Sequence, residues 1–431
     1  MRIQSYLSLN KGRDLLLFIL AFFSLAPSVF TIVETFGFHW TIYRFLLVTL
    51  VFLWLCIRAL STIRISKKTL SFKWMLMLLC WIIWFFPAFI LSAFRDSHRA
   101  FLEILSLANA FFMFLLITYL SHFIPKGRFI TVFNIILVAN ICLAFFEIIS
   151  GHHTWTSMLV DKTYGDRSNN SMHLATGFMY NVNDFSTCIT CLLPFAFIFK
   201  KKSITFLIVL CVMMINHIND ANICNLGILV GLVYFFFFYR KKDDRIKIFG
   251  AVFCIAIVVA IAGIIIFFPS IANRLPVIST LSRQISNAQE NMGSLYKRLT
   301  IYKESILAVI PRKLWGYGPA SFTNYFTRFP SMSYLVNPHG YLIEILFEYG
   351  IFILAWFVYC LGSLVGFARK HLRSLEDHNQ YGLIAIEFVI LFAFCSFSPS
   401  TFFTYQFHWA IIATLCVILN EKKEEKIECR F

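Results

Sequence analysis

Charged residues are scarce in this chain of 431 residues. Only 14% of the residues are Asp, Glu, Lys or Arg, and 59% are hydrophobic. The mean hydropathy is +0.74. Soluble domains carry about 25% charged residues, and a water-exposed fold could not hide this much apolar surface. The composition therefore excludes a soluble enzyme or scaffold and predicts a protein embedded in a lipid bilayer.

The sequence also lacks the motifs that hold cofactors. It contains no HExxH, no cluster of His and Cys, no aspartate-rich Mg²⁺ motif and no glycine-rich phosphate loop. None of the 12 cysteines lies in residues 269–338, so no disulfide framework is expected there. We expect no metal, no cofactor and no ATP-driven chemistry. A substrate already activated through a phosphate ester would supply the energy instead.

Apolar runs long enough to cross a bilayer recur along the whole chain. We identify about twelve, which predicts an all-α fold, a polytopic membrane helix bundle. The seventh and eighth runs are separated only by Asn219 and Asp220, so a re-entrant pair is the alternative there. The runs are Leu15–Glu34, Trp40–Leu60, Phe72–Phe94, Ala100–Phe123, Phe129–Ser150, Asp184–Phe199, Ile204–Ile218, Ala221–Tyr239, Ile248–Phe268, Tyr341–Phe367, Tyr381–Phe397 and Phe402–Leu419.

Basic residues set the expected orientation of the bundle. The chain has 38 Lys and Arg against 22 Asp and Glu, and basic runs such as 200–202 and 240–242 fall on one side. The positive-inside rule makes that side, with both termini, cytoplasmic. This predicts a multi-pass membrane protein with both termini in the cytoplasm. The net charge of +16 reflects topology, because the basic runs are too short and dispersed for nucleic acid.

One external segment breaks the charge rule. Residues 269–338, between the ninth and tenth spans, carry eight Lys and Arg but only Glu290 and Glu304 as acids. Cations retained on the disfavoured side favour a site for an anionic substrate. The expected organisation is a bundle over 1–268 with an external loop at 151–183, the large external loop 269–338, three spans over 339–420 and a cytoplasmic tail at 421–431.

The large loop is expected to contain an amphipathic helix that ends at Pro311. Lys297, Arg298 and Lys303 lie off its apolar face, where they can meet lipid headgroups or a substrate pyrophosphate. The apolar face consists of Leu295, Leu299, Tyr302, Ile306 and Ile310.

Three ionisable residues mark the start of the tenth span. A neutral imidazole at His339 can take a proton from a hydroxyl, whereas the alternative role is an interfacial anchor. Glu344 and Glu348 follow on one helix face, where carboxylates favour a polar pocket. They can orient His339 or bind sugar hydroxyls, or form a structural pair with a cation such as Arg44. Arg44, near the outer end of the second span, can also contact a phosphate.

Three segments in order carry a family resemblance. The segment from Asn337-Pro-His339 to Glu348-Tyr-Gly350 resembles the start of a span in the O-antigen ligase and polymerase family, which includes teichuronic-acid and capsule polymerases. Residues 298–322, with Trp-Gly-Tyr-Gly-Pro, and residues 176–185, with Asn-Val-Asn-Asp, are similar to two further family segments. The sequence departs from the family at Gly340, at Ala320 and at the start of the eighth span, which lacks the family's arginine.

The resemblance implies a GT-C-like membrane glycosyltransferase. Such an enzyme moves a glycan from an undecaprenyl-pyrophosphate carrier to a sugar hydroxyl, of a glycan or of a lipid-linked acceptor. The resemblance places this reaction on the outer face of the bacterial cytoplasmic (inner) membrane. It implies His339 and Glu348 as catalytic groups. It implies substrate binding by Arg298, Glu344, Arg44, Lys297, Lys303, Asn181, Asn183 and Asp184.

Two questions stay open at the level of sequence. A lipid-linked oligosaccharide flippase, or another polysaccharide transporter, would share the topology and the basic character. It would not need a long external loop and would more often show two similar halves, which this chain lacks. The choice between ligase and polymerase is also open.

Overall fold

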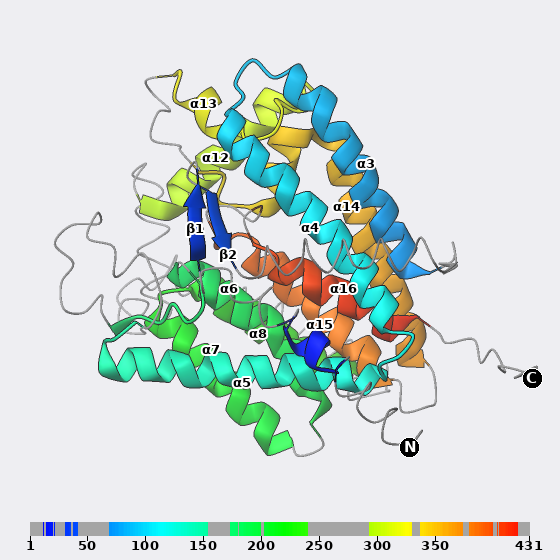
Figure 1. Ribbon diagram of the computed structural model, residues 1–431. Helices are drawn as coiled ribbons and strands as arrows, with labels where there is room; N and C mark the ends of the chain where they lie inside the picture. The colour runs from blue at the N-terminus through cyan, green and yellow to red at the C-terminus, as the bar shows by residue number, and fades with distance from the viewer. Residues whose placement is uncertain are drawn as a thin grey trace, which may run out of the picture.

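The computed structural model describes most of the helical part of the chain. The described residues are 12, 14–19, 21, 31–35, 38–41, 69–153, 173–179, 181–199, 202–239, 293–329, 337–373, 379–399, 403 and 405–420. Their regular elements are helices, apart from one small hairpin (Figure 1).

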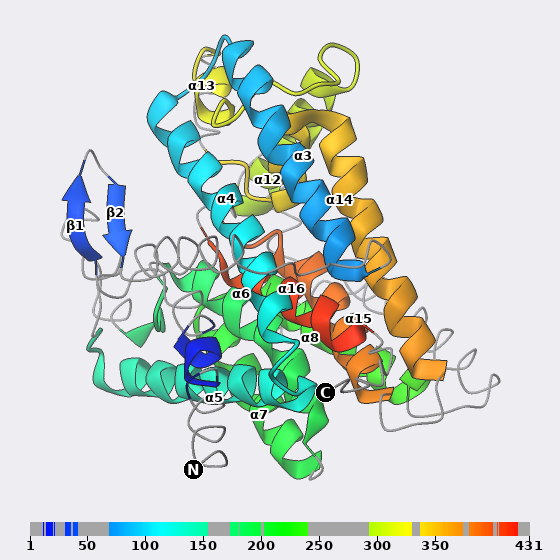
Figure 2. The same cartoon turned by 45° about the vertical axis from the view of Figure 1, so that its right-hand side comes forward.

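One group of helices forms the upper body of the molecule. Figures 1 and 2 show α3 (Leu70–Ile90), α4 (Ser97–Leu120) and α14 (Tyr341–Arg373) side by side, with α16 (Phe407–Leu419) packed at their lower half. An aromatic cluster joins all four helices. Trp74 and Trp81 of α3 meet Phe357 of α14 and Trp409 of α16, with ring centroids 5.6–6.4 Å apart. Phe114 of α4 lies 6.1 Å from Trp74 and 6.4 Å from Trp409. Such rings bury large areas in edge-to-face contact, so they fix how the helices cross.

A second group packs beneath the first. It comprises α5 (Lys126–Ser150), α6 (Val182–Leu192) with the 3₁₀ segment Leu193–Ile198, α7 (Lys202–Ile218), α8 (Asn222–Val233) with the π-helical Tyr234–Tyr239, and α15 (Asn379–Cys395). The helix α15 contacts both α14 and α8, so it links the two groups.

The apolar runs predicted from the sequence appear as helices where the structure describes them. Four helices are long and apolar enough to cross a membrane: Leu70–Ile90, Ser97–Leu120, Lys126–Ser150 and Tyr341–Leu372. They correspond to the expected third, fourth, fifth and tenth spans. Shorter apolar helices occupy the positions of the sixth, seventh, eighth, eleventh and twelfth expected spans. The ninth span, 248–268, lies outside the described residues, as does most of the first two.

A hairpin corrects the all-α prediction. Strands β1 (Thr31–Thr35) and β2 (Phe38–Thr41) pair antiparallel, with Thr35 opposite Phe38. The expected first span therefore does not continue as helix to Glu34, and the second does not begin as helix at Trp40. The cause lies in the sequence Thr-Ile-Val-Glu-Thr, because β-branched residues favour strands over helices.

The large loop contributes two helices above the start of α14. They are α12 (Gly293–Val309) and the short α13 (Phe322–Phe326). The helix α12 ends before Pro311, as expected. It packs on α14 through buried Ile301, Ala308 and Val309, while Leu299 and Ile306 are exposed. The predicted apolar stripe thus faces largely away from the bundle.

Candidate functional site

A glycine-rich turn from the large loop holds the centre of the site. The turn at Gly316–Gly318 lies against a break in α14 at Gly350, where the backbone has φ 84° and ψ −179°. The amides of Tyr317 and Gly318 donate to the carbonyls of Phe347 and Glu348, at 2.8 and 2.9 Å. These bonds tie the turn to α14 just before its break at Gly350 and hold the main chain of Glu348 in place.

Close approach explains the glycines. A Cβ on Gly316 would lie 2.6 Å from the Glu348 carbonyl oxygen, and one on Gly350 would lie 2.3 Å from the Leu314 carbonyl oxygen. Both residues also have positive φ, at 83° and 84°, which side chains disfavour.

We expect Gly316→Ala to destabilise the protein by about 1–3 kcal/mol, because it adds a clash to a strained backbone position. Gly362→Ala is the matched control, since it lies in α14 with nothing within 4 Å of its Cβ. Thermal unfolding of the detergent-purified variants measures both. An unchanged melting temperature for Gly316→Ala would contradict the tight junction.

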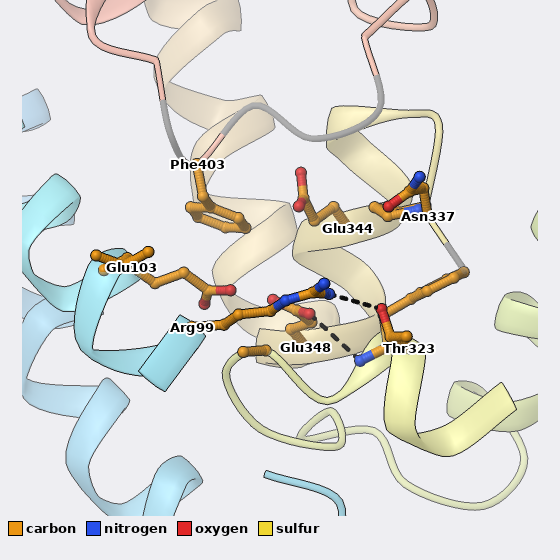
Figure 3. Close-up of a pocket in the computed structure, with 11 residues that line it drawn as sticks. Arg99, Glu103, Thr323, Asn337, Glu344, Glu348 and Phe403 are labelled. Atoms are coloured by element: carbon orange, nitrogen blue, oxygen red, sulfur yellow. Dashed lines mark hydrogen bonds between the residues drawn. The ribbon is translucent and has the colours of Figure 1, made fainter. Parts of the chain in front are cut away.

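A cavity opens beside this junction. It encloses about 290 Å³ between α4, the loop segments and α14. Figure 3 shows Glu103 and Arg99 approaching from α4, and Glu344 and Glu348 from α14 on the other side. The remaining lining residues are Leu102, Ala320, Phe322, Thr323, Asn337, Pro338 and Phe403.

The polar groups of the cavity are held by specific hydrogen bonds. The Phe322 amide donates to Glu348 Oε1 at 3.4 Å, and the Tyr349 hydroxyl donates to Glu103 Oε2 at 2.7 Å. Exposed Arg99 donates to the Thr323 hydroxyl at 3.0 Å (Figure 3) and pairs with Asp96 at 3.7 Å. The sequence prediction of a polar pocket at Glu344 and Glu348 therefore matches the geometry of this cavity.

His339 lies next to the cavity on the side of α12. Its neighbours Asn337 and Pro338 line the cavity, while its own carbonyl accepts from the Tyr302 hydroxyl at 2.7 Å. Its backbone is left-handed, with φ 44°. Among the described residues, no hydrogen-bond partner reaches its buried Nδ1.

Electrostatics keep the His339 ring neutral. Burial lowers the pKa of His339 to about 4, and the nearby cations Arg298 and then Lys297 add to the effect. Both causes disfavour the charged imidazolium. The ring is therefore an unprotonated acceptor at neutral pH, next to two cations that can hold an anion.

The other expected site residues lie at varying distances from this centre. Asn183, at the start of α6, accepts from the Ser398 hydroxyl at 3.5 Å. The preceding Phe397 ring lies 5.7 Å from Tyr302, so this segment reaches the surroundings of His339. Asp184 accepts from Tyr405, and Asn181 caps α6 by accepting from the Asn183 amide. These three residues do not line the cavity.

The structure does not place two of the predicted site residues at the cavity. Lys303 is exposed on α12. Arg44 lies outside the described residues.

Sequence reasoning missed Arg99 and Glu103 as site residues. Both come from α4, far from the large loop in sequence, and pairing Glu103 with Glu348 needs the helix packing itself. A signal was present, since a carboxylate inside an apolar run usually faces a pocket or a partner.

Comparison with known proteins matches part of the chain to a family. Residues 204–358 match the protein family described as O-Antigen ligase. The family resemblance read from the sequence is confirmed. The matching segment contains Arg298, His339, Glu344 and Glu348, and it ends before the segments at α15 and α16. It does not include Asn181, Asn183 or Asp184, nor Arg99 and Glu103 of α4.

A curated relative agrees with the O-antigen ligase family match. The teichuronic acid biosynthesis protein TuaE of Bacillus subtilis (strain 168) is 23% identical over 362 residues, which cover 80% of this chain and 71% of the relative. Together with the four helices that are long and apolar enough to cross a membrane, these matches indicate a multi-pass membrane protein that resembles proteins of surface-polysaccharide biosynthesis.

Proposed function

We propose that the protein transfers a glycan from an undecaprenyl-pyrophosphate carrier to a sugar hydroxyl on the outer face of the membrane. The observation that carries the proposal is the pairing of a neutral imidazole with cations. His339 is held unprotonated beside Arg298 and Lys297, and the carboxylate-lined cavity lies on the other side of Asn337 and Pro338.

Each part of this arrangement has a role in such a transfer. His339 accepts the proton from the acceptor hydroxyl as that oxygen attacks the anomeric carbon. The bond to the pyrophosphate breaks, and Arg298 and Lys297 stabilise the charge that develops on the leaving group. One base and direct displacement give inversion at the anomeric carbon. Glu348, fixed by the glycine junction, is the second candidate for the base.

The active site faces outward in this proposal. The large loop and the start of α14 then lie where a lipid-linked glycan arrives after it has crossed the membrane. Exposed Leu299 and Ile306 on α12 support a position at the bilayer surface, because they match the apolar face of an interfacial helix.

The second candidate is a flippase or other polysaccharide transporter. It would need a path through the bundle, whereas the polar groups described above gather at one end of α14. The cavity that those groups line is also close to the lower limit of about 300 Å³ for ordinary ligand pockets, too small for a passing oligosaccharide.

Reconstitution tests the proposal. Proteoliposomes with purified protein, a labelled undecaprenyl-pyrophosphate glycan and an acceptor glycan should give a new, larger glycan and free carrier pyrophosphate. A control preparation carries His339→Ala. Movement of label across the bilayer without a new glycosidic bond would establish the transporter and end the transferase proposal.

A further inference from the structure

We infer that Tyr302 is a positioning residue, whose hydroxyl holds the main chain of His339 so that the imidazole and Arg298 meet the same substrate. The role of the imidazole as the base rests on the proposed function. The contact between Tyr302 and His339 rests on the geometry alone.

The backbone at His339 has a conformation that other elements must fix. Its φ is 44°, in the left-handed region that residues with side chains seldom adopt. Such a conformation persists only where the surrounding structure determines it. The direction of the imidazole ring follows from this backbone, so the contacts that fix the backbone also aim the ring.

Contacts from two sides fix this stretch of backbone. The Tyr302 hydroxyl, from α12, donates to the His339 carbonyl at 2.7 Å. The Tyr341 amide donates to the carbonyl of Ser396, directly after the end of α15, at 3.1 Å. The two peptide groups that flank Gly340 are therefore both held, one from α12 and the other from the end of α15.

Tyr302 is itself firmly placed. Its ring lies against Phe397, with centroids 5.7 Å apart, and its neighbour Ile301 is buried against α14. Burial raises the pKa of Tyr302 to about 12, and the Arg298 charge opposes this rise. The hydroxyl therefore keeps its proton at neutral pH and remains a hydrogen-bond donor.

The glycine at position 340 makes room for the Tyr302 ring. Gly340 does not have a positive φ, so its backbone conformation does not require a glycine. A Cβ there would lie 3.2 Å from both Cε1 and the hydroxyl oxygen of Tyr302, and 3.5 Å from Phe397 Cδ1. A side chain at this position would therefore press the hydroxyl away from the His339 carbonyl. Space for Tyr302 is a physical reason for a glycine where the sequence departs from the family.

The same contact relates the base to the cation. Arg298 precedes Tyr302 by four residues on α12, so both side chains lie on one face of the helix. The Arg298 charge affects the pKa of both Tyr302 and His339, so the guanidinium lies near each of them. Tyr302 thus holds the helix that carries the cation against the residue that carries the base. A displacement of about 1 Å between groups that act together can cost about 10²-fold in rate.

Tyr302→Phe tests the inference, because it removes the hydroxyl and keeps the ring that packs on Phe397. In the proteoliposome assay we expect kcat to fall about tenfold, which corresponds to the loss of about one hydrogen bond. The KM values for donor and acceptor should not change, because the loss acts on the base in the transition state. Tyr296→Phe removes a hydroxyl from the same helix and should keep the wild-type kcat. Equal kcat values for the two variants, or a rise in KM without a fall in kcat, would overturn the inference.

Gly340→Ala disturbs the same contact from the other side. Its methyl group should displace the Tyr302 hydroxyl and lower kcat with the KM values unchanged. Gly362→Ala, which adds a methyl group with nothing within 4 Å, is the matched control. A wild-type kcat for Gly340→Ala would contradict the role given to the space at this glycine.

A chemical probe tests the contact without the transfer reaction. Diethyl pyrocarbonate modifies unprotonated imidazoles, and mass spectrometry of the purified protein gives the rate at each histidine. We expect His339 to react faster in Tyr302→Phe than in the wild type. Buried His153, which lies 3.2 Å from Glu147, should react equally slowly in both.

The pattern of modification separates the possible outcomes. An unchanged rate at His339 would overturn the inference. An equal increase at His153 would do so too, because it would mean that the fold has loosened as a whole. Faster modification confined to His339, in a protein whose wild type transfers no glycan, would keep the contact and end the proposed function.

Discussion

We expect His339→Ala to reduce glycan transfer by about 10²–10⁴-fold, the usual cost of losing a general base. The protein should still fold, because no described residue hydrogen-bonds to the ring Nδ1 and the bond to the Tyr302 hydroxyl involves only the His339 carbonyl. The measurement is the initial rate in proteoliposomes at equal protein level. His152→Ala is the matched control, because His152 is exposed just after the end of α5 and does not line the cavity.

Two further variants separate basicity from positioning. His339→Gln and His339→Asn keep hydrogen bonding but cannot take the proton, and Asn also tolerates the left-handed backbone at φ 44°. Both should be as inactive as His339→Ala. If either retains most of the activity, His339 positions the substrate, and the base must be sought at Glu348. A lower protein level with normal specific activity would instead make His339 an interfacial anchor.

The pH dependence of the transfer rate should reflect the protonation of His339. The base must be unprotonated, and the pKa of His339 is lowered to about 4. The rate should therefore stay level as pH falls from neutrality to about 5 and then fall through about 4, whereas an ordinary histidine would lose activity around its reference pKa of ~6.5. Lys297→Gln removes one of the cations that lower this pKa, so it should shift the acid limb to higher pH.

The sequence predicted the helical elements well because each is set by local pattern. Runs of apolar residues predicted the helices that the structure describes, and Pro311 predicted where α12 ends. The hairpin at Thr31–Thr41 was missed because hydropathy counts β-branched residues as span-forming, although their backbone preference is for strands.

The candidate site was predictable only in part. His339, Glu344 and Glu348 lie close together in the chain, and their positions in one motif pointed to a pocket. Glu103 and Arg99 reach that pocket from α4, and no local pattern shows which helix faces which. The reason for Gly316 and Gly350 was likewise hidden, because two backbones far apart in sequence must touch before either glycine is required.

The position of Arg298 links α12 to the candidate site at the start of α14. Arg298 lies one helical turn before Tyr302, and the Tyr302 hydroxyl donates to the His339 carbonyl. The half-buried guanidinium is thereby kept close enough to lower the pKa of His339. A cation so placed can bind the pyrophosphate and keep the base neutral at the same time.

We expect Arg298→Ala to lower the transfer rate by at least about 10²-fold, in line with the loss of one group that stabilises developing charge. Arg298→Lys should recover little, because a guanidinium binds a pyrophosphate through two parallel hydrogen bonds and an ammonium acts as a point charge. Arg312→Ala makes the same change in charge at an exposed position of the same loop and should leave the rate near that of the wild type. The decisive reading is the rate at saturating donor for all three variants at equal protein level. Equal rates for Arg298→Ala and Arg312→Ala would mean that the loop provides only a general positive potential, whereas a loss confined to position 298 assigns the pyrophosphate to that guanidinium.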